Sequence, residues 1–125
     1  MKVRRWLLPV LWAGVMLTGT SLPSSVVPSQ VSTVDKVLHF TIYAIFAVLL
    51  TRSISENTPR WLAAAIAVAV SLVFAAADEW HQGFIPGRST ELADWHADAL
   101  GAVIGALTAA AFIRRRSSGG THTTA

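Results

Sequence analysis

The sequence predicts an all-α protein, a bundle of four transmembrane helices with both termini in the cytoplasm. Of its 125 residues, 53% are hydrophobic and 14% are charged, whereas charged residues make up about a quarter of an ordinary soluble domain. The charged residues are also gathered into short clusters that separate four apolar stretches. These stretches are Trp6–Leu22, Val37–Thr51, Trp61–Ala77 and Ala99–Ile113.

Each apolar stretch is about 15–17 residues long, slightly short of the ~20 residues with which a helix crosses ~30 Å of hydrocarbon. Polar residues at the ends of each stretch extend the helix, so we expect all four to span the membrane. A segment in lipid must satisfy its own backbone hydrogen bonds, which makes helices the expected structure.

The positions of the basic residues predict the orientation. Eight of the ten lysines and arginines lie on the side of the two termini, where Glu56 is the only acid. Lysine and arginine near the ends of spanning helices mark the cytoplasmic side. Most of the acids then face outward, accompanied by Lys36 and Arg88.

Several function classes are disfavoured by the same composition. The sequence pI is about 10.2, but the basic residues lie between apolar runs and not along one stripe, so we expect a lipid bilayer and no nucleic acid as partner. The chain has no cysteine, which excludes disulfides and thiolate metal ligands. The acids gather at one side without a polar path to the other, which argues against a channel or transporter.

We expect a single membrane domain over residues 1–116, followed by a flexible cytoplasmic tail over residues 117–125. Residues 1–22 also have the basic start and apolar core of a signal peptide. Cleavage there would leave three helices. No Ala-x-Ala cleavage site precedes Pro23, so we expect this segment to stay as the first helix.

Capping residues set the expected boundaries of the other helices. The second helix should begin near residue 33, after Ser32. The third should run from about Pro59, at its first helical position after a Thr58 cap, to Gln82, with a glycine ending it. A tight loop over residues 84–89 should turn at Pro86-Gly87, and Thr90 should cap the fourth helix.

Polar side chains recur every four residues at the outer ends of three predicted helices. Residues four apart share one face of a helix, so each helix carries a polar ridge. At ~1.5 Å per residue these ridges fall within one slab less than ~10 Å thick. We therefore expect them to meet in an outward-facing cleft. The ridges are Asp35, His39 and Tyr43; Asp78 and Gln82; and Asp94 and Asp98.

This cleft could support acid–base chemistry, because neighbouring carboxylates in a partly buried site can act as an acid and a base together. We take Asp78 and Asp94 as the candidate base and acid, and His39 as a proton shuttle. Arg88 and Lys36 are candidates for holding a phosphate. The remaining candidate binding residues are Asp35, Glu79, Gln82, Asp98 and Tyr43.

A divalent cation is a second use for the same side chains, since carboxylate oxygens and an imidazole suit magnesium, manganese or zinc. No established metal spacing such as His-Glu-x-x-His is present, so the cofactor stays open. Structural interpretations also stay open. Arg88 could bridge carboxylates to pin a loop, His39 could join two helices, and Tyr43 could pack with its hydroxyl tied to a neighbour.

A further pattern predicts close packing of the fourth helix. Ala97, Gly101, Gly105 and Ala109 are small residues spaced four apart. Such a ridge lets another helix approach closely in a membrane. We interpret it as a packing surface and not as part of the chemistry.

These motifs resemble the VanZ-like family of small bacterial membrane proteins over about residues 35–109. The matching pieces are Asp35-Lys36-x-x-His39-x-x-x-Tyr43, Asp78-Glu79-x-x-Gln82, Pro86-Gly87-Arg88 and Asp94-x-x-x-Asp98-x-x-Gly101. Many relatives carry asparagine where Asp98 stands. The resemblance implies a bacterial cytoplasmic (inner) membrane protein and an association with resistance to the glycopeptide antibiotic teicoplanin.

Two functions follow as hypotheses. In the first, the outward-facing site binds or acts on an envelope lipid or cell-wall precursor bearing a phosphate or carboxylate. In the second, the protein is a non-catalytic structural or partner-binding module, and its polar cluster only locks the helices together. Whether the chain is an enzyme is left undecided by the sequence, as is its substrate.

Overall fold

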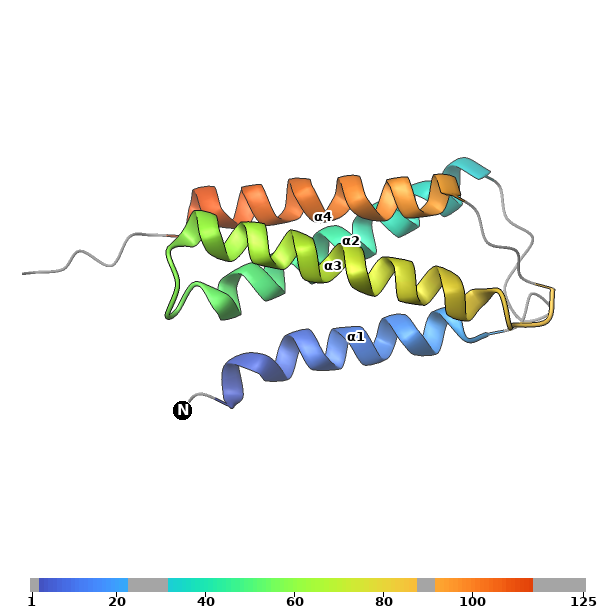
Figure 1. Ribbon diagram of the computed structural model, residues 1–125, viewed down its shortest axis with the longest axis horizontal. Helices are drawn as coiled ribbons and strands as arrows, with labels where there is room; N and C mark the ends of the chain where they lie inside the picture. The colour runs from blue at the N-terminus through green and yellow to red at the C-terminus, as the bar shows by residue number, and fades with distance from the viewer. Residues whose placement is uncertain (1–2, 23–31, 88–91, 114–125) are drawn as a thin grey trace, which may run out of the picture.

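The structure is a computed structural model that describes residues 3–22, 32–87 and 92–113, and every regular element in these ranges is helical. A short 3₁₀ turn, η1 (Arg4–Trp6), leads into α1 (Leu7–Thr20). Three longer helices follow, namely α2 (Ser32–Ile54), α3 (Arg60–Gln82) and α4 (Leu92–Phe112). The helices lie side by side with alternating direction, so α1 and α3 end where α2 and α4 begin (Figure 1).

Three helices have the length and composition to cross a membrane: residues 33–54, 60–82 and 92–112. This confirms the prediction of an all-helical membrane protein. Helix α1 has 14 residues, which at ~1.5 Å per residue reach ~21 Å, less than the ~30 Å of a hydrocarbon core. The fourth spanning helix therefore stays a prediction, and so does the position of the termini.

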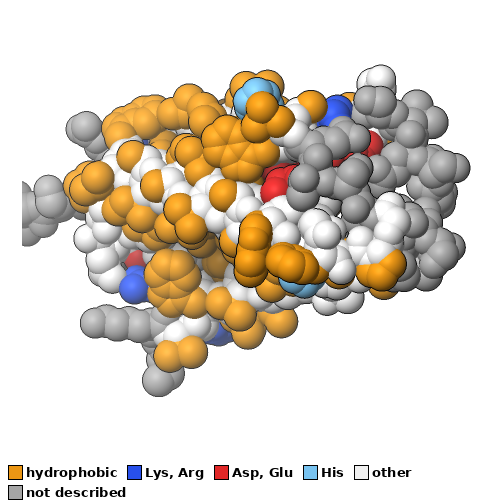
Figure 2. All heavy atoms as spheres, turned by 45° about the vertical axis from the view of Figure 1, so that its right-hand side comes forward, with side chains coloured by type: hydrophobic (Ala, Val, Ile, Leu, Met, Phe, Trp, Pro, Cys, Tyr) orange, Lys and Arg blue, Asp and Glu red, His pale blue; other side chains and the backbone are white. Residues whose placement is uncertain are grey.

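The outer surface of the bundle is apolar, as expected for helices in contact with lipid. Large hydrophobic side chains on α3 and α4 are well exposed, among them Val73 (71%), Leu100 (56%) and Phe112 (81%). Figure 2 shows hydrophobic side chains spread over the face turned to the viewer, with acidic side chains visible toward both ends of the described part. Charged side chains thus lie near the ends of the bundle and apolar side chains cover most of this face.

The closest packing in the bundle is between α2 and α4. A Cβ added to Gly101 would lie 2.2 Å from the carbonyl oxygen of Phe40, and one added to Gly105 would lie 2.2 Å from that of Ala44. Real Cβ atoms do not approach so closely, so only glycine fits at these two positions. The structure confirms the small-residue ridge as a packing surface. Its consequence is that the polar side chains of α2 and α4 are held face to face.

The bundle interior is built from small residues and from one group of three packed aromatic side chains. Alanines from α3 and α4 are fully buried, and the rings of Tyr43, Phe46 and Phe74 pack together with centroids 5.1–6.4 Å apart. Tyr43 is only 2% exposed. The aromatic group therefore forms an apolar floor beneath the polar end of the bundle.

Helix α1 docks against α2 through side-chain hydrogen bonds to backbone. The indole Nε1 of Trp12 donates to the carbonyl of Ile42 over 3.1 Å, and the hydroxyl of Ser53 donates to the carbonyl of Arg5 over 2.7 Å. Arg5 also pairs with Glu56 at 3.1 Å. Contacts from η1 and from the middle of α1 thus fix the position of this segment along the bundle.

The end of α3 agrees with the boundary predicted from the sequence, and its start differs. Helix α3 ends at Gln82 as predicted, and Gly87 adopts a positive φ of 77° in the turn after it. Pro59, however, is the N-cap of α3 and not its first helical residue, and no side chain caps this end. The predicted cap of α4 at Thr90 lies outside the described residues.

Candidate functional site

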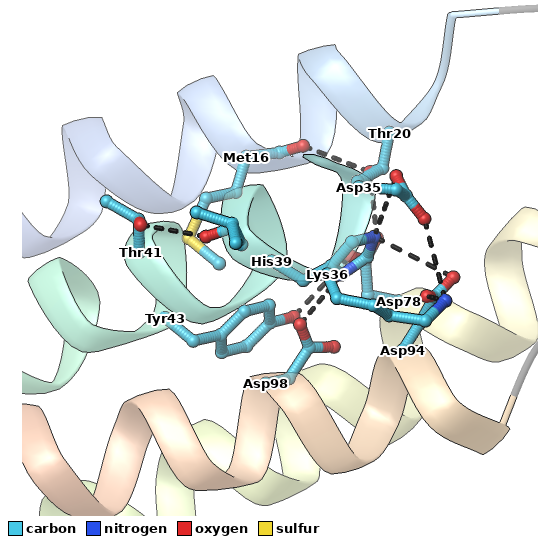
Figure 3. Close-up of polar contacts among 11 residues, drawn as sticks. Met16, Thr20, Asp35, Lys36, His39, Thr41, Tyr43, Asp78, Asp94 and Asp98 are labelled. Atoms are coloured by element: carbon cyan, nitrogen blue, oxygen red, sulfur yellow. Dashed lines mark hydrogen bonds and ion pairs between the residues drawn. The ribbon is translucent and has the colours of Figure 1, made fainter. Parts of the chain in front are cut away.

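Polar side chains from all four helices meet at the end of the bundle where α2 and α4 begin. Figure 3 shows Asp35, Lys36 and His39 of α2 pointing toward Asp94 and Asp98 of α4, with Asp78 of α3 and Thr20 of α1 beside them. The four-residue spacing explains this convergence, because it puts each set on one helix face. We call this group, together with Tyr43, Glu79 and Gln82, the polar cluster.

His39 is the centre of the polar cluster. Its Nδ1 lies 2.7 Å from Oδ1 of Asp98, a carboxylate that is 1% exposed. Its Nε2 lies 3.8 Å from both Oδ1 of Asp35 and Oδ2 of Asp94. Each nitrogen of this imidazole therefore faces at least one carboxylate, and the ring connects the carboxylates on its two sides.

Lys36 joins the two carboxylates that face Nε2 of His39. Its Nζ forms an ion pair with Oδ1 of Asp94 and lies 3.8 Å from Oδ2 of Asp35. Each carboxylate is thus divided, with one oxygen toward the lysine and the other toward the imidazole. Because Asp94 is 6% exposed, its charge depends on these partners and not on water.

Asp78 is held from two other directions. The hydroxyl of Thr20 donates to its Oδ1 over 2.8 Å, and the hydroxyl of Tyr43 donates to its Oδ2 over 3.5 Å. Asp78 is 3% exposed. Its carboxylate therefore lies at the junction of α1, α2 and α3.

Thr20 is a site residue that the sequence interpretation missed. It lies at the last position of α1, in an apolar stretch where it looked like the end of a membrane segment. Its single hydroxyl hydrogen lies between two acceptors, Oδ1 of Asp78 at 2.8 Å and the carbonyl oxygen of Met16 at 3.0 Å. In the sequence, its role was indicated only by its depth, because its hydroxyl lies at the same level along the helix as the other polar residues.

The other predicted site residues are divided between the cluster and the undescribed part of the chain. Gln82 is 3% exposed and lies one turn beyond Asp78 on the same face of α3. Glu79 has a carboxylate oxygen within 4.8 Å of ligand atoms of His39 and Asp98. Arg88, the candidate anion clamp, lies outside the described residues.

Two overlapping sets of side chains could hold a metal ion. Asp35, His39 and Asp94 form the first, and His39, Glu79 and Asp98 the second, with ligand atoms within 4.8 Å of one another in each. Carboxylate oxygens and imidazole nitrogen suit magnesium, manganese or zinc. The same residues are also linked by the ion pairs of Lys36 and His39, so geometry alone leaves the occupant open.

In the described part of the cluster, carboxylates outnumber basic side chains. Five carboxylates surround Lys36 and His39, namely Asp35, Asp78, Glu79, Asp94 and Asp98. Buried ionisable groups in a membrane segment are costly unless they pair or face a wet cavity. A cluster of this kind can hold a proton or a cation, and an anionic ligand would have to bind at Lys36 or at a bound cation.

Comparison with known proteins identifies the family. A family model described as VanZ/LLP1 matches residues 5–114, a range that includes α1 to α4 and the whole polar cluster. No curated protein and no solved structure gave a match. The match extends beyond the 35–109 region of the motifs and confirms the resemblance that they suggested. The chain belongs to the VanZ/LLP1 family of membrane proteins.

Proposed function

We propose that the polar cluster is an outward-facing site in the bacterial cytoplasmic membrane that binds or acts on a component of the cell envelope. The ligand would carry a phosphate or a carboxylate, as envelope lipids and cell-wall precursors do. The family resemblance suggests resistance to teicoplanin as the cellular role. This role agrees with an envelope ligand, because that antibiotic acts on the cell envelope.

The position of His39 carries this proposal. An imidazole with a carboxylate on each ring nitrogen can accept a proton on one side and release one on the other. Asp98 lies 2.7 Å from one nitrogen, and Asp35 and Asp94 face the other. A histidine that only filled space between helices would need one such partner and not three.

The proposed roles follow from the contacts of each side chain. Asp94, whose Oδ2 lies 3.8 Å from Nε2 of His39, serves as the acid, and the imidazole relays the proton once the two groups close to hydrogen-bond distance or a water bridges them. Asp78, held by Thr20 and Tyr43 in a fixed orientation, serves as the base. Lys36 is the cation that the described part of the cluster offers to an anionic group, and Arg88 would complete the clamp.

A second candidate function is structural, and one observation favours it. The pairs Lys36–Asp94 and His39–Asp98 both join α2 to α4. Ion pairs that cross between helices could serve solely to fix their register, without any ligand. The protein would then be a structural or partner-binding module.

The two functions predict opposite results for the same four variants. We would replace Asp78 and Asp94 by Asn, and His39 and Arg88 by Gln, one at a time in the full chain. Two properties are measured, the thermal unfolding midpoint in detergent and the teicoplanin susceptibility of bacteria that express each variant. Loss of protection that exceeds the loss of folded protein, whatever the change in midpoint, supports the envelope site.

A lowered midpoint in all variants, with protection falling only in proportion to protein yield, would support the structural function. Mass spectrometry of lipids that co-purify with the protein adds a direct readout. We expect wild-type protein to retain a phosphate-bearing or carboxylate-bearing component that Asp78→Asn loses. Wild-type behaviour of all four variants in every assay would overturn the proposal.

A further inference from the structure

A cavity of about 380 Å³ lies at the end of the bundle opposite the polar cluster. It is bounded by η1 and α1 on one side and by the last turns of α2 on the other, with Ile113 completing the wall. Specific small-ligand sites in proteins enclose roughly 300–1,000 Å³, so a head group of ordinary size fits here. None of its lining residues belongs to the polar cluster.

Two arginines give this cavity a positive character. Arg5 and Arg52 both line it, together with a single acid, Glu56. The Nη1 of Arg5 lies 3.1 Å from Glu56, and the side-chain oxygen of Asn57, in the amide orientation that satisfies its hydrogen bonds, accepts from Nη1 and Nη2 of Arg5, so this guanidinium contributes mainly its charge to the cavity. The guanidinium of Arg52 makes no ion pair with any described side chain. The cavity therefore holds donor groups that a bound anion could use.

The other polar groups in the cavity wall are already engaged. The hydroxyl of Ser53 donates to the carbonyl of Arg5 over 2.7 Å, and that of Ser55 donates to the carbonyl of Arg52 over 2.9 Å. These bonds leave the arginines as the principal donors to a ligand. Guanidinium groups bind phosphate oxygens through paired, charge-assisted hydrogen bonds. A phosphate is thus the anion that this wall fits best.

The rest of the wall is apolar and continues along the outside of α1. Leu8, Pro9, Leu49 and Ile113 line the cavity. Leu8 is 61% exposed, and Leu11, one turn further along α1, is 56% exposed. A phosphate that reached the arginines could therefore be followed by hydrocarbon chains lying against this helix.

The cavity also lies at the level where a spanning helix leaves the hydrocarbon. Arg52 is two residues before the end of α2, whose span covers residues 33–54. Lipid phosphates occupy the same level in a bilayer, and basic pockets between transmembrane helices bind anionic head groups. We propose that this cavity binds the phosphate of an anionic phospholipid, with Arg52 and Arg5 as its donors and α1 as the surface for the acyl chains.

The test is native mass spectrometry of the full chain in detergent, with phosphatidylglycerol and phosphatidylcholine added at equal concentration. We expect one phosphatidylglycerol to bind in preference to phosphatidylcholine. Arg52→Gln should weaken that binding by about tenfold, as expected for the loss of one charge-assisted hydrogen-bond donor. Because Arg52 is exposed, its replacement should leave the fold intact.

Arg4→Gln is the matched control, since it removes the same charge from an exposed residue that does not line the cavity. Binding in this variant should equal that of the wild type. Glu56→Gln should strengthen binding, because it removes the anion that competes for Arg5. Wild-type binding by Arg52→Gln, or equal losses in Arg4→Gln and Arg52→Gln, would overturn the proposal.

A large excess of inorganic phosphate separates the two sources of the anion. We expect it to leave phosphatidylglycerol bound, because free phosphate lacks the acyl chains that contact α1. Displacement of the lipid by inorganic phosphate would show that the cavity is a simple anion site and would overturn the lipid assignment. These outcomes do not depend on the polar cluster, so they leave the proposed function of that cluster untouched.

Discussion

Nδ1 of His39 lies 2.7 Å from Oδ1 of Asp98, and this contact joins α2 to α4 directly above the glycines that bring the two helices together. Asp98 is 1% exposed, so its carboxylate cannot exchange the imidazole for water. The contact requires close packing of the helices, and the packing in turn buries the contact. Fold and site are therefore coupled at this pair.

Replacing Asp98 by Asn should preserve the stability of the protein, whereas Asp98→Leu should lower it. The amide oxygen of Asn can still accept a hydrogen bond from Nδ1 of His39, but Leu leaves that donor buried without a partner, at a cost of about 1–3 kcal/mol. Thermal unfolding in detergent checks this. We expect a midpoint near the wild type for Asp98→Asn and a clear drop for Asp98→Leu. Equal midpoints would mean that the contact contributes nothing to stability.

Lys36→Met should be one of the most destabilising single changes in the chain. Asp94 is 6% exposed and pairs with Lys36. Removing one partner of a fully buried pair costs about 3–5 kcal/mol; here we expect a smaller but large cost, because Lys36 is 25% exposed and His39 still faces Asp94. Lys36→Arg retains the charge and should be milder. The double variant Lys36→Met with Asp94→Asn should recover much of the loss in unfolding midpoint; no recovery would show that the pair is not coupled.

Gly105→Ala should disrupt the approach of α2 to α4. The added Cβ would lie 2.2 Å from the carbonyl oxygen of Ala44, so the helices must move apart, and overpacking of this kind costs about 1–3 kcal/mol. Gly14→Ala is the matched control, because a Cβ there meets nothing within 4 Å. The unfolding midpoint should fall for Gly105→Ala and stay unchanged for Gly14→Ala. A similar response from both would contradict the close packing seen here.

The sequence was sufficient to predict the meeting of α2, α3 and α4. Polar residues four apart on each helix share a face, and the depth of each ridge could be counted along the helix. The small residues at Gly101 and Gly105 also predicted which surface of α4 would pack closely. Helical periodicity carries this information because it is a local property of the chain.

Contacts between helices that lack such a pattern could not be predicted. Thr20 bonds to Asp78, although the two are 58 residues apart and Thr20 belongs to no ridge. Arg60, interpreted as an orientation marker, also donates to the carbonyls of Ala110 and Ile113 at the end of α4. Side chains that satisfy the backbone of another helix depend on tertiary packing, and spacing along one helix does not reveal it.

Thr20→Val should loosen α1 and alter the environment of Asp78. Valine has nearly the shape of threonine but cannot donate to Oδ1 of Asp78, and an interhelical hydrogen bond in a membrane protein contributes about 0.6–1.7 kcal/mol. Thr18→Val is the control, since the Thr18 hydroxyl bonds only within its own helix, to Gly14. Hydrogen exchange of the α1 amides should rise in Thr20→Val alone. If both variants exchange alike, α1 does not depend on this contact.

The proposed orientation can be tested at the two ends of α3. Asn57 precedes this helix, Pro86 follows it, and both are exposed. The chain has no cysteine, so Asn57→Cys and Pro86→Cys each introduce a unique thiol. A membrane-impermeant maleimide applied to intact cells should label Pro86→Cys, and should label Asn57→Cys only after the membrane is opened. The reverse pattern would put the polar cluster on the cytoplasmic side, where an envelope precursor outside the membrane could not reach His39.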